Sequence, residues 1–254
     1  ITTDRHALSV LIYMYLFFRH PLRGGKIHDM TDEMRDETLA MGEKALFIEH
    51  PGDNSNAVKI NQLSSFSLPW ADPKTIPYSI MGPYITPLFD RAFIDGLHDA
   101  TKRPTADEWE TALVKTMDLI QPCQNKNCQQ KWYVFSGKTK PICPYCGAPY
   151  IGKLPILNLY SSRKVGSYRP DDHRLMVWSG QSIYAWHVNR LIAPNERTSA
   201  EQKKRVGYFV YHNEQWWLVN EGIQGLISLP DKRHVAVGEK IELKDNAQFV
   251  LSQE

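Results

Sequence analysis

The chain has 254 residues and a formal net charge of +2, with 42% hydrophobic, 11% aromatic and 23% charged residues. These values are typical of globular proteins, so they exclude a disordered or a fibrous chain. The charge is uneven, because residues 1–122 hold 12 Lys and Arg against 17 Asp and Glu whereas residues 123–254 hold 18 against 11, which makes the second part the expected surface for an acidic partner.

An almost continuous apolar run from Ala7 to Phe18 predicts the first helix, which should end before Pro21. The run is too short to span a bilayer with a hydrocarbon core of about 30 Å. It also lacks the basic leader and the cleavage site of a signal peptide, so this run is expected to be neither a membrane helix nor a signal peptide. Because this helix carries apolar side chains on every face, we expect it to be buried on all sides. The burial should require more protein than the next hundred residues supply.

Three further helices are predicted before residue 122. The first, Thr31 to Leu46, is acidic and amphipathic, and a long ordered loop rich in Pro, Asn and Ser follows it from His50 to Tyr78. The other two, Tyr84 to Leu97 and Ala106 to Ile120, each carry apolar residues along one helical stripe. The last helix is preceded by the Thr-x-x-Glu signature of a capping box, which starts at Thr105.

All the cysteines of the chain fall in one short stretch, as Cys123, Cys128, Cys143 and Cys146. Two close-spaced pairs of thiolates joined by a loop can hold a tetrahedral zinc ion, and Gly147 suits the sharp turn of a zinc knuckle. Four thiolates leave no position for a water molecule, so the predicted zinc ion is structural rather than catalytic. Paired disulfides or an accidental cluster are the alternatives. Four clustered cysteines with none elsewhere suit a reducing compartment better than a secreted disulfide framework, so a cytoplasmic protein is expected.

After residue 153 the pattern changes to short β-rich runs separated by turn residues, which predicts an antiparallel β-sandwich. A polar segment from Ala193 to Lys204 interrupts the runs and is expected to be a surface loop. Trp216 and Trp217 are adjacent, so in a strand one should lie in the core and the other at an edge or interface. The predicted strands are Leu154–Tyr160, Arg174–Trp178, Ser182–Val188, Gly207–His212, Gln215–Val219, Ile223–Leu229, His234–Val237, Lys240–Leu243 and Gln248–Leu251.

Two segments of the helical part resemble landmarks of the large lobe of Ser/Thr protein kinases. Asp4 to Leu16, with Arg19-His-Pro-Leu after it, is similar to the central hydrophobic helix of that lobe, and Asp99 to Trp109, with its Arg-Pro-Thr, is similar to the start of the last helix. The resemblance implies that Asp4 holds the backbone of the catalytic loop and that Arg103 pairs with the Glu of an Ala-Pro-Glu motif. The alternative is a free-standing helical domain whose Arg-Pro-Thr is only a capping box.

The motifs of kinase catalysis do not occur in this sequence. It contains no glycine-rich phosphate loop, no strand lysine of the Val-Ala-Ile-Lys type, no His-Arg-Asp and no Asp-Phe-Gly. We therefore expect no catalytic residues and no nucleotide site, and we interpret the chain as the non-catalytic C-terminal part of a kinase.

The closing strands, around Trp217 to Asn220, Val237 to Leu243 and Phe249 to Leu251, are similar to the last strands of forkhead-associated domains. Members of that family bind phosphothreonine through a Ser and an Arg at loop ends, with a His that supports the loop. The matching place here, Ile183 to His187, keeps a His but has Tyr and Ala instead of Ser and Arg. The resemblance implies the fold, whereas phosphopeptide binding is less expected because Ala cannot replace a bidentate guanidinium.

Together these patterns predict an α+β chain of three domains: a partial kinase large lobe over residues 1–122, a zinc ribbon over 123–152 and a forkhead-associated-like sandwich over 153–254. This order resembles bacterial kinases linked to tellurite resistance, which are associated with a von Willebrand factor A protein and a metal-dependent phosphatase. The resemblance implies a docking and regulatory role with a von Willebrand A protein as partner, and it leaves the oligomeric state open.

Two other functions stay open. Nucleic-acid binding would use cations around the metal and aromatic residues between them, although the charge excess is modest. These residues are Lys126, Lys131, Lys138 and Lys140, with Trp132, Tyr133 and Phe135. The second alternative is a phosphothreonine-peptide reader built on the sandwich.

Overall fold

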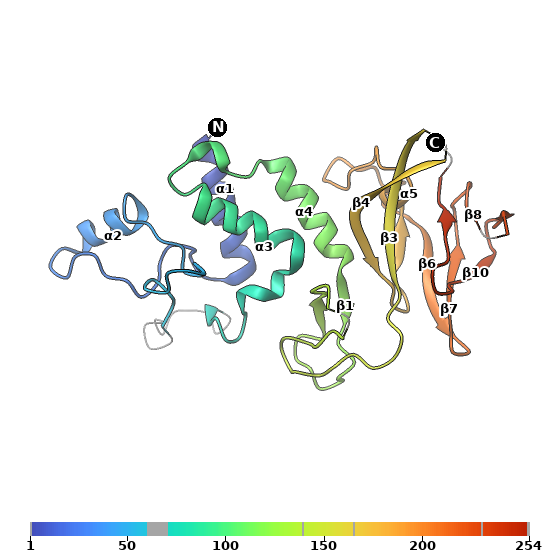
Figure 1. The fold of residues 1–254 in the computed structure, drawn as a ribbon, viewed down its shortest axis with the longest axis horizontal. Helices are drawn as coiled ribbons and strands as arrows, with labels where there is room; N and C mark the ends of the chain where they lie inside the picture. The colour runs from blue at the N-terminus through green and yellow to red at the C-terminus, as the bar shows by residue number, and fades with distance from the viewer. Residues whose placement is uncertain (1, 60–70, 139, 165, 230, 253–254) are drawn as a thin grey trace. The chain divides into compact units, whose positions relative to one another are not determined.

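The computed structural model describes residues 2–59, 71–138, 140–164, 166–229 and 231–252. The chain forms two compact units, Ile1–Tyr150 and Ile151–Glu254. Helices and small antiparallel sheets make up the described residues, so the expected α+β class is confirmed (Figure 1). The four cysteines lie in the first unit, together with all the described helices except the short α5 (Ala185–Val188).

The first unit contains the predicted helices, with shifted ends. The second helix is shorter than expected because Asp32 caps it and Gly42 ends it. The third begins two residues earlier and changes into a π-helical turn. The elements are α1 (Thr2–Phe17), α2 (Glu33–Met41), η3 (Tyr78–Met81), α3 (Gly82–Asp90), η4 (Arg91–Asp95), η5 (Ala100–Lys102), α4 (Ala106–Asp118), β1 (Ile120–Pro122) and β2 (Trp132–Val134).

The segment expected to be a long loop, His50 to Tyr78, has no α-helix or strand among its described residues. Residues 60–70 of this prediction lie outside the described residues. Three glycine and asparagine contacts fix its start: the Gly25 amide donates to the carbonyl oxygens of Asn56 and Ala57 at 3.4 and 3.2 Å, and Asn56 donates to the carbonyl of Leu22 at 3.0 Å. A Cβ atom on Gly24 would lie 1.6 Å from the Asn56 carbonyl oxygen, so only glycine fits there.

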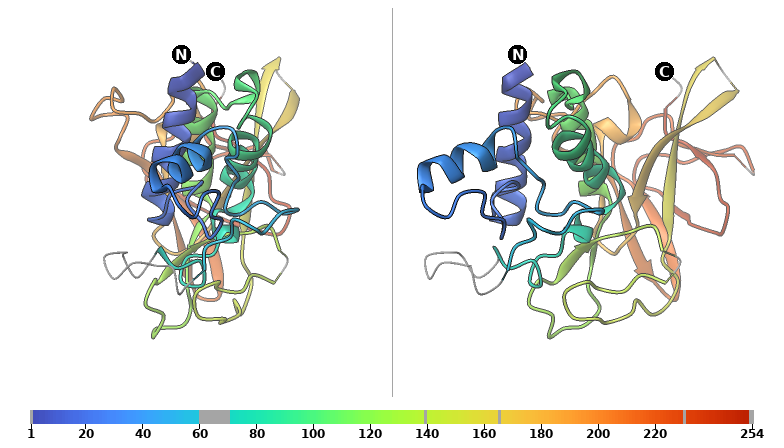
Figure 2. Two further views of the ribbon diagram at one scale, coloured as in Figure 1. Left: turned by 90° about the vertical axis from the view of Figure 1, so that its left-hand side faces the viewer. Right: turned by 60° about the vertical axis from the view of Figure 1, so that its left-hand side comes forward.

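Aromatic rings form the core of the first unit. Tyr13 of α1 lies 4.5 Å from Phe17 and 5.0 Å from Phe89 of α3, and Trp109 of α4 lies 4.8 Å from Phe89, between ring centroids. These rings are almost completely buried. Helices α3 and α4 run side by side (Figure 2). Pairs of aromatic rings at such distances stabilise a core beyond the apolar area that they bury.

The expectation that the first helix is buried on all sides is wrong for the described chain. Tyr13 and Phe17 face the aromatic core, but an opposite stripe is exposed, with Leu11 52%, Met14 42%, Tyr15 79% and Phe18 45% accessible. Leu11, Met14 and Tyr15 have the spacing of one helix face, and Phe18 follows directly after the end of α1 with φ +56°. We call this set the α1 stripe. The aromatic core of the first unit covers only the other side of α1. An apolar sequence therefore does not show which faces of a helix are covered by the rest of the chain.

A buried ion pair ties the end of α1 to the segments that follow. Arg19 is buried, and its guanidinium lies 2.7 Å from the Glu49 carboxylate and donates to the Ile76 carbonyl at 3.0 Å. The Tyr13 hydroxyl donates to the same carboxylate at 3.3 Å. One side chain therefore holds three chain segments that lie far apart in sequence.

The second unit consists of antiparallel strands around one core. Its sheets have the strand orders β10-β7-β6-β5 and β11-β8-β9, and β3 and β4 form a separate hairpin. The elements are β3 (Ile156–Lys164), β4 (Ser167–Met176), β5 (Ser182–Tyr184), α5 (Ala185–Val188), β6 (Arg205–His212), β7 (Gln215–Asn220), β8 (Ile227–Ser228), β9 (Arg233–His234), β10 (Lys240–Glu242) and β11 (Phe249–Val250). The core is built from Leu175, Val177, Ile183, Phe209, Leu218, Ile223, Leu226, Val235 and Ile241.

Several predicted strands are wrong in extent: β3 and β4 extend into a long hairpin, Ile156–Lys164 and Ser167–Met176, beyond the predicted 154–160 and 174–178, and β9 covers Arg233–His234 instead of His234–Val237. Two further differences have a clear local cause. The strand expected over Ser182 to Val188 stops at Tyr184, because the ring nitrogen Nδ1 of His187 accepts a hydrogen bond from the Tyr184 amide at 3.0 Å and starts the short helix α5. The strand expected over Ile223 to Leu229 shrinks to β8. Its first residue is held instead by the buried Asn220 side chain, which accepts from the Ile223 amide at 2.7 Å.

For the second unit, the two tryptophans face opposite sides as expected, although both are half-buried and β7 is an inner strand of its sheet, and the surface loop is confirmed. Trp216 packs against the core, whereas Trp217 lies on the opposite face of β7 with the Lys240 ammonium 4.5 Å above its ring. Residues 193–204 contain no helix or strand and are mostly exposed. The alternation of side chains along a strand explains the first result, since neighbours must point to opposite faces.

Candidate metal centre

The first pair of cysteines sits at the end of a short hairpin that continues helix α4. After the buried Leu119, strand β1 pairs with β2 in the register Ile120 to Val134 and Pro122 to Trp132. Cys123 follows β1 directly, and its amide donates to the Lys131 carbonyl at 2.7 Å. The hairpin thus fixes the backbone on both sides of the first knuckle.

The second pair lies in a tight turn of its own. The Cys143 amide donates to the Ala148 carbonyl at 2.8 Å, and the Gly147 amide donates back to the Cys143 carbonyl at 2.9 Å. Gly147 has φ +72°, which is the left-handed conformation that glycine adopts without strain. The sharp turn expected after Cys146 is therefore present.

The two knuckles bring the four sulfur atoms together. Cys123 and Cys146 lie 3.6 Å apart, Cys128 and Cys143 lie 3.8 Å apart, and all four ligand atoms lie within 4.8 Å of one another. A regular tetrahedron with metal–sulfur bonds of about 2.3 Å places its sulfurs about 3.8 Å apart. All four cysteines are free thiols. The arrangement fits one tetrahedral metal ion and not two disulfides.

The four thiols differ in burial and in acidity. Cys128 and Cys143 are buried, Cys123 is half-buried and Cys146 is exposed. Burial raises the pKa of Cys123 to about 12 and also raises the pKa of Cys143. The Ala148 amide, which donates to the Cys146 sulfur, lowers the pKa of Cys146 to about 7. Because a metal binds thiolates, Cys146 ionises more readily than Cys123 and Cys143, which need the cation to do so.

Aromatic side chains join the centre to the helical part of the first unit. Tyr133 is buried against the cysteines, and Tyr145 packs against both the cysteines and the aromatic core. Gly82, with φ +73°, lets the start of α3 approach β2 closely, because a Cβ atom there would lie 2.6 Å from the Val134 Cγ1 atom. The centre is consequently a fixed part of the first unit.

The burial of the aromatic residues bears on nucleic-acid binding. Of the three aromatic residues expected to stack on bases, Tyr133 and Phe135 are buried and only Trp132 is exposed. Stacking requires an accessible ring face. The geometry of the ribbon therefore supports nucleic-acid binding less than the sequence pattern suggested.

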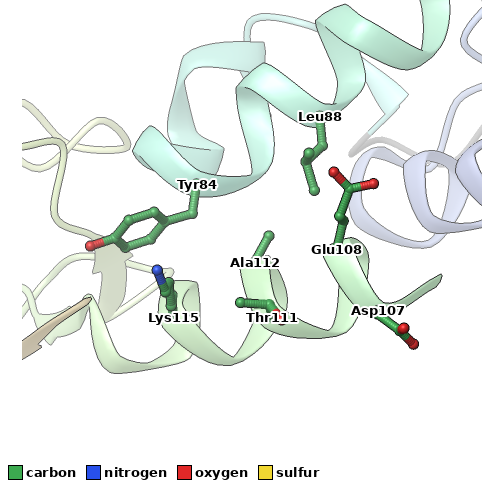
Figure 3. A pocket seen from close by; sticks show the side chains of 7 residues that line it. All are labelled: Tyr84, Leu88, Asp107, Glu108, Thr111, Ala112 and Lys115. Atoms are coloured by element: carbon green, nitrogen blue, oxygen red, sulfur yellow. The ribbon is translucent and has the colours of Figure 1, made fainter. Parts of the chain in front are cut away.

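A second concave site, an open groove of about 330 Å³, lies between α3 and α4. Leu88 and Ala112 face one another across it, with Tyr84 and Lys115 at one end (Figure 3). At the other end Glu108 is engaged, since it pairs with Arg91 at 2.7 Å and accepts from the Thr105 amide at 2.8 Å. The groove thus has an apolar floor, and its carboxylate is engaged in capping α4. Such a lining does not provide the groups that catalysis needs.

The structure places both residues to which the sequence resemblance gave a role, Arg103 and Asp4. Arg103 donates from Nε to the Gly96 carbonyl at 2.7 Å and from Nη2 to the Leu97 carbonyl at 3.0 Å, so it satisfies the carbonyls after η4. The sequence did not reveal this contact, because the acceptors are backbone groups. Asp4 lies in the first turn of α1 and is exposed.

Within the described part of the chain, every helix falls short of the length and apolar character needed to cross a membrane. Comparisons with family models, with curated proteins and with solved structures give no match to this chain. What can be said of its function therefore rests on the residues and the geometry given above.

Proposed function

We propose that this chain is a non-catalytic, partner-docking and regulatory region of a Ser/Thr protein kinase, with a structural zinc ion held by Cys123, Cys128, Cys143 and Cys146. In this proposal residues 1–122 are part of a kinase large lobe, residues 123–152 a zinc ribbon and residues 153–254 a degenerate forkhead-associated-like domain. Its bacterial relatives would be the kinases linked to tellurite resistance, and its partner a von Willebrand A protein.

The α1 stripe is the observation that carries the proposal. Four large apolar side chains on one side of α1 and directly after its end are exposed, although the other face of the same helix forms the centre of an aromatic core. A continuous apolar surface of this kind marks a site of protein contact. In a kinase lobe this helix is central, so the proposal assigns the stripe to contact with the remaining elements of such a lobe or with the docked partner.

The assignment of zinc is supported by the donor set. Thiolates prefer soft cations in tetrahedral geometry, and two knuckles with buried sulfurs match structural zinc sites. Such a site contributes about 10 kcal/mol or more of binding free energy to folding. The zinc ion would therefore stabilise the junction between α4 and the ribbon and perform no chemistry of its own.

The proposal for the second unit is a sandwich that has lost phosphopeptide binding. His187 is buried and its Nδ1 atom already accepts the Tyr184 amide, so it supports the local turn. Ile183 lies in the core. Neither side chain is available to grip a phosphate, and this supports a docking role over a reader of phosphothreonine.

A binding measurement tests the proposal. The zinc-loaded chain should retain a von Willebrand A domain protein at micromolar concentration, and Tyr15→Lys should weaken this binding at least tenfold because it places a charge in the α1 stripe. Met117→Lys is the matched control, because Met117 is also a large exposed apolar residue but lies on α4. Equal binding by Tyr15→Lys and the control, or phosphotransfer from ATP by the purified chain, would contradict the proposal.

A further inference from the structure

Helix α2 and the loop before it form a small acidic surface that the folding of the first unit does not explain. We call residues 27–37 the α2 surface. Helix α2 buries none of its side chains, and it lies at the margin of the first unit, away from α3 and α4 (Figures 1 and 2). Most helices in proteins are stabilised by packing an apolar face. No side chain of this nine-residue helix is fully buried, and Met41 at its end is the one described residue of α2 that packs, half-buried, against the aromatic core.

Carboxylates fix this surface in one conformation. Asp36 accepts hydrogen bonds from the amides of His28 and, at 3.0 Å, Asp29, which folds the loop onto the first turn of α2. Asp29 accepts from the amides of Thr31 at 2.9 Å and Asp32 at 3.1 Å. These amide donors lower the pKa of both Asp29 and Asp36, so both are charged at neutral pH. The surface is therefore ordered before any partner binds, which reduces the entropy cost of binding.

The same surface displays apolar side chains to solvent. Ile27 is 58% exposed, Met30 90% and Met34 82%. Burying these side chains would be favourable, yet the described chain leaves them open. Methionine is flexible and polarizable, and it recurs on surfaces that pack against apolar side chains of different partners.

The charge around these side chains indicates the chemistry of the partner. Residues 27–43 hold six Asp and Glu and one Arg, a net −5, which equals the net charge of all of residues 1–122. Two of the carboxylates are paired, Glu37 with Arg23 and Asp29 with Arg35. Asp32 caps α2 by accepting from the Arg35 amide at 3.0 Å, and Glu33 follows it on the exposed first turn. A partner that buries the methionines must therefore bring positive charge to the carboxylates around them.

We propose that the α2 surface binds a cationic amphipathic helix of a partner protein, whose apolar face covers Ile27, Met30 and Met34 and whose Lys and Arg side chains face the carboxylates. Helices bind other proteins in this way when an apolar stripe meets an apolar surface and flanking charges fix the orientation. The inference does not depend on the kinase resemblance, because it uses only exposure and charge. It also concerns a surface other than the α1 stripe.

A peptide titration tests it on the full zinc-loaded chain. The probe is a fluorescein-labelled Leu/Lys peptide of about four helical turns with its leucines on one face. The double variant Met30→Ser with Met34→Ser should bind it at least tenfold more weakly than the parent chain. Glu33→Gln should weaken it a few fold, and this loss should shrink at high salt.

Matched controls separate this site from general attraction between opposite charges. Met117→Ser and Glu196→Gln alter exposed side chains elsewhere and should leave the affinity unchanged. A peptide of the same composition with a scrambled order should bind at least tenfold more weakly than the amphipathic one. Parent-like binding by the methionine double variant, or equal binding of the scrambled peptide, would overturn the proposal. Circular dichroism checks that each variant is folded.

Discussion

At the scale of single residues, the two cysteines of the second knuckle make different demands on the chain. Cys143 is buried, so a serine there would leave the cation with a poor ligand that no water molecule can replace. Cys146 is exposed, and a water molecule can take its place. We expect Cys143→Ser to lose bound metal and to lower the thermal midpoint more than Cys146→Ser. Native mass spectrometry and thermal unfolding measure the two effects, and full metal occupancy in both variants would contradict the assignment.

The buried pair of Arg19 and Glu49 provides a second residue-scale prediction. Removing Arg19 leaves the Ile76 carbonyl without this donor and leaves a largely buried carboxylate with the Tyr13 hydroxyl but without its cation. Breaking a buried pair in this way costs about 3–5 kcal/mol. Arg19→Leu should therefore lower the free energy of unfolding by about 3 kcal/mol in chemical denaturation. The control is Arg23→Leu, which breaks an ion pair of two exposed side chains and should cost less than about 1 kcal/mol.

The imidazole of His20 predicts a dependence on pH. Burial, with smaller contributions from Arg23 and His6, lowers the pKa of His20 to about 4. The folded state thus favours the neutral ring, whose Nδ1 accepts the Leu22 amide at 3.1 Å, while the unfolded state protonates near pH 6.5. Stability should fall as the pH decreases from about 6.5 towards 4. His20→Asn keeps an acceptor, so it should flatten this part of a stability–pH profile, and an unchanged slope would refute the assignment.

At the scale of elements, the start of α4 was the most predictable feature. Thr105 Oγ1 accepts from the Glu108 amide at 3.3 Å, and Glu108 accepts from the Thr105 amide at 2.8 Å, which confirms the capping box. Both contacts join residues three apart, so the local sequence was sufficient. The positions of the cysteine knuckles were predictable for the same reason.

The capping box can be tested by removing the side-chain hydroxyl of Thr105. Thr105→Ala removes the acceptor for the Glu108 amide and should destabilise the first unit by about 1 kcal/mol. Thr111→Ala is the control, because Thr111 lies exposed in the middle of the same helix and alanine has the higher helix propensity. Thermal unfolding should show a lower midpoint for the first variant only. Equal midpoints would mean that the box contributes nothing to stability.

Elements that depend on distant contacts were less predictable. The apolar sequence of α1 indicates a buried helix, but the side that is buried depends on Phe47, Phe89 and Phe93, which arrive much later in the chain. The end of β5 depends on a side-chain acceptor, His187, that competes with the strand ladder. Asn220 shortens β8 in the same way. Periodicity contains no information about either hydrogen bond.

At the scale of the whole molecule, the two units should respond differently to loss of metal. All four thiols lie in the first unit, and the core of the second unit is built from its own residues. After chelation we expect faster amide exchange in α4 and residues 120–150, with β6 and β7 still protected. Hydrogen-exchange mass spectrometry measures both segments in one experiment. Equal loss of protection in β6 and β7 would show that the units unfold together.

The dual packing of Tyr145 has a practical consequence. The ring touches the sulfur cluster on one side and the aromatic core on the other, and Trp109 belongs to that core. Loss of the metal ion should free the Tyr145 ring from its packing and so change the environment of the buried Trp109 indole. The fluorescence of Trp109 should therefore report metal occupancy without any added dye, in a variant in which the other six tryptophans of the chain are replaced.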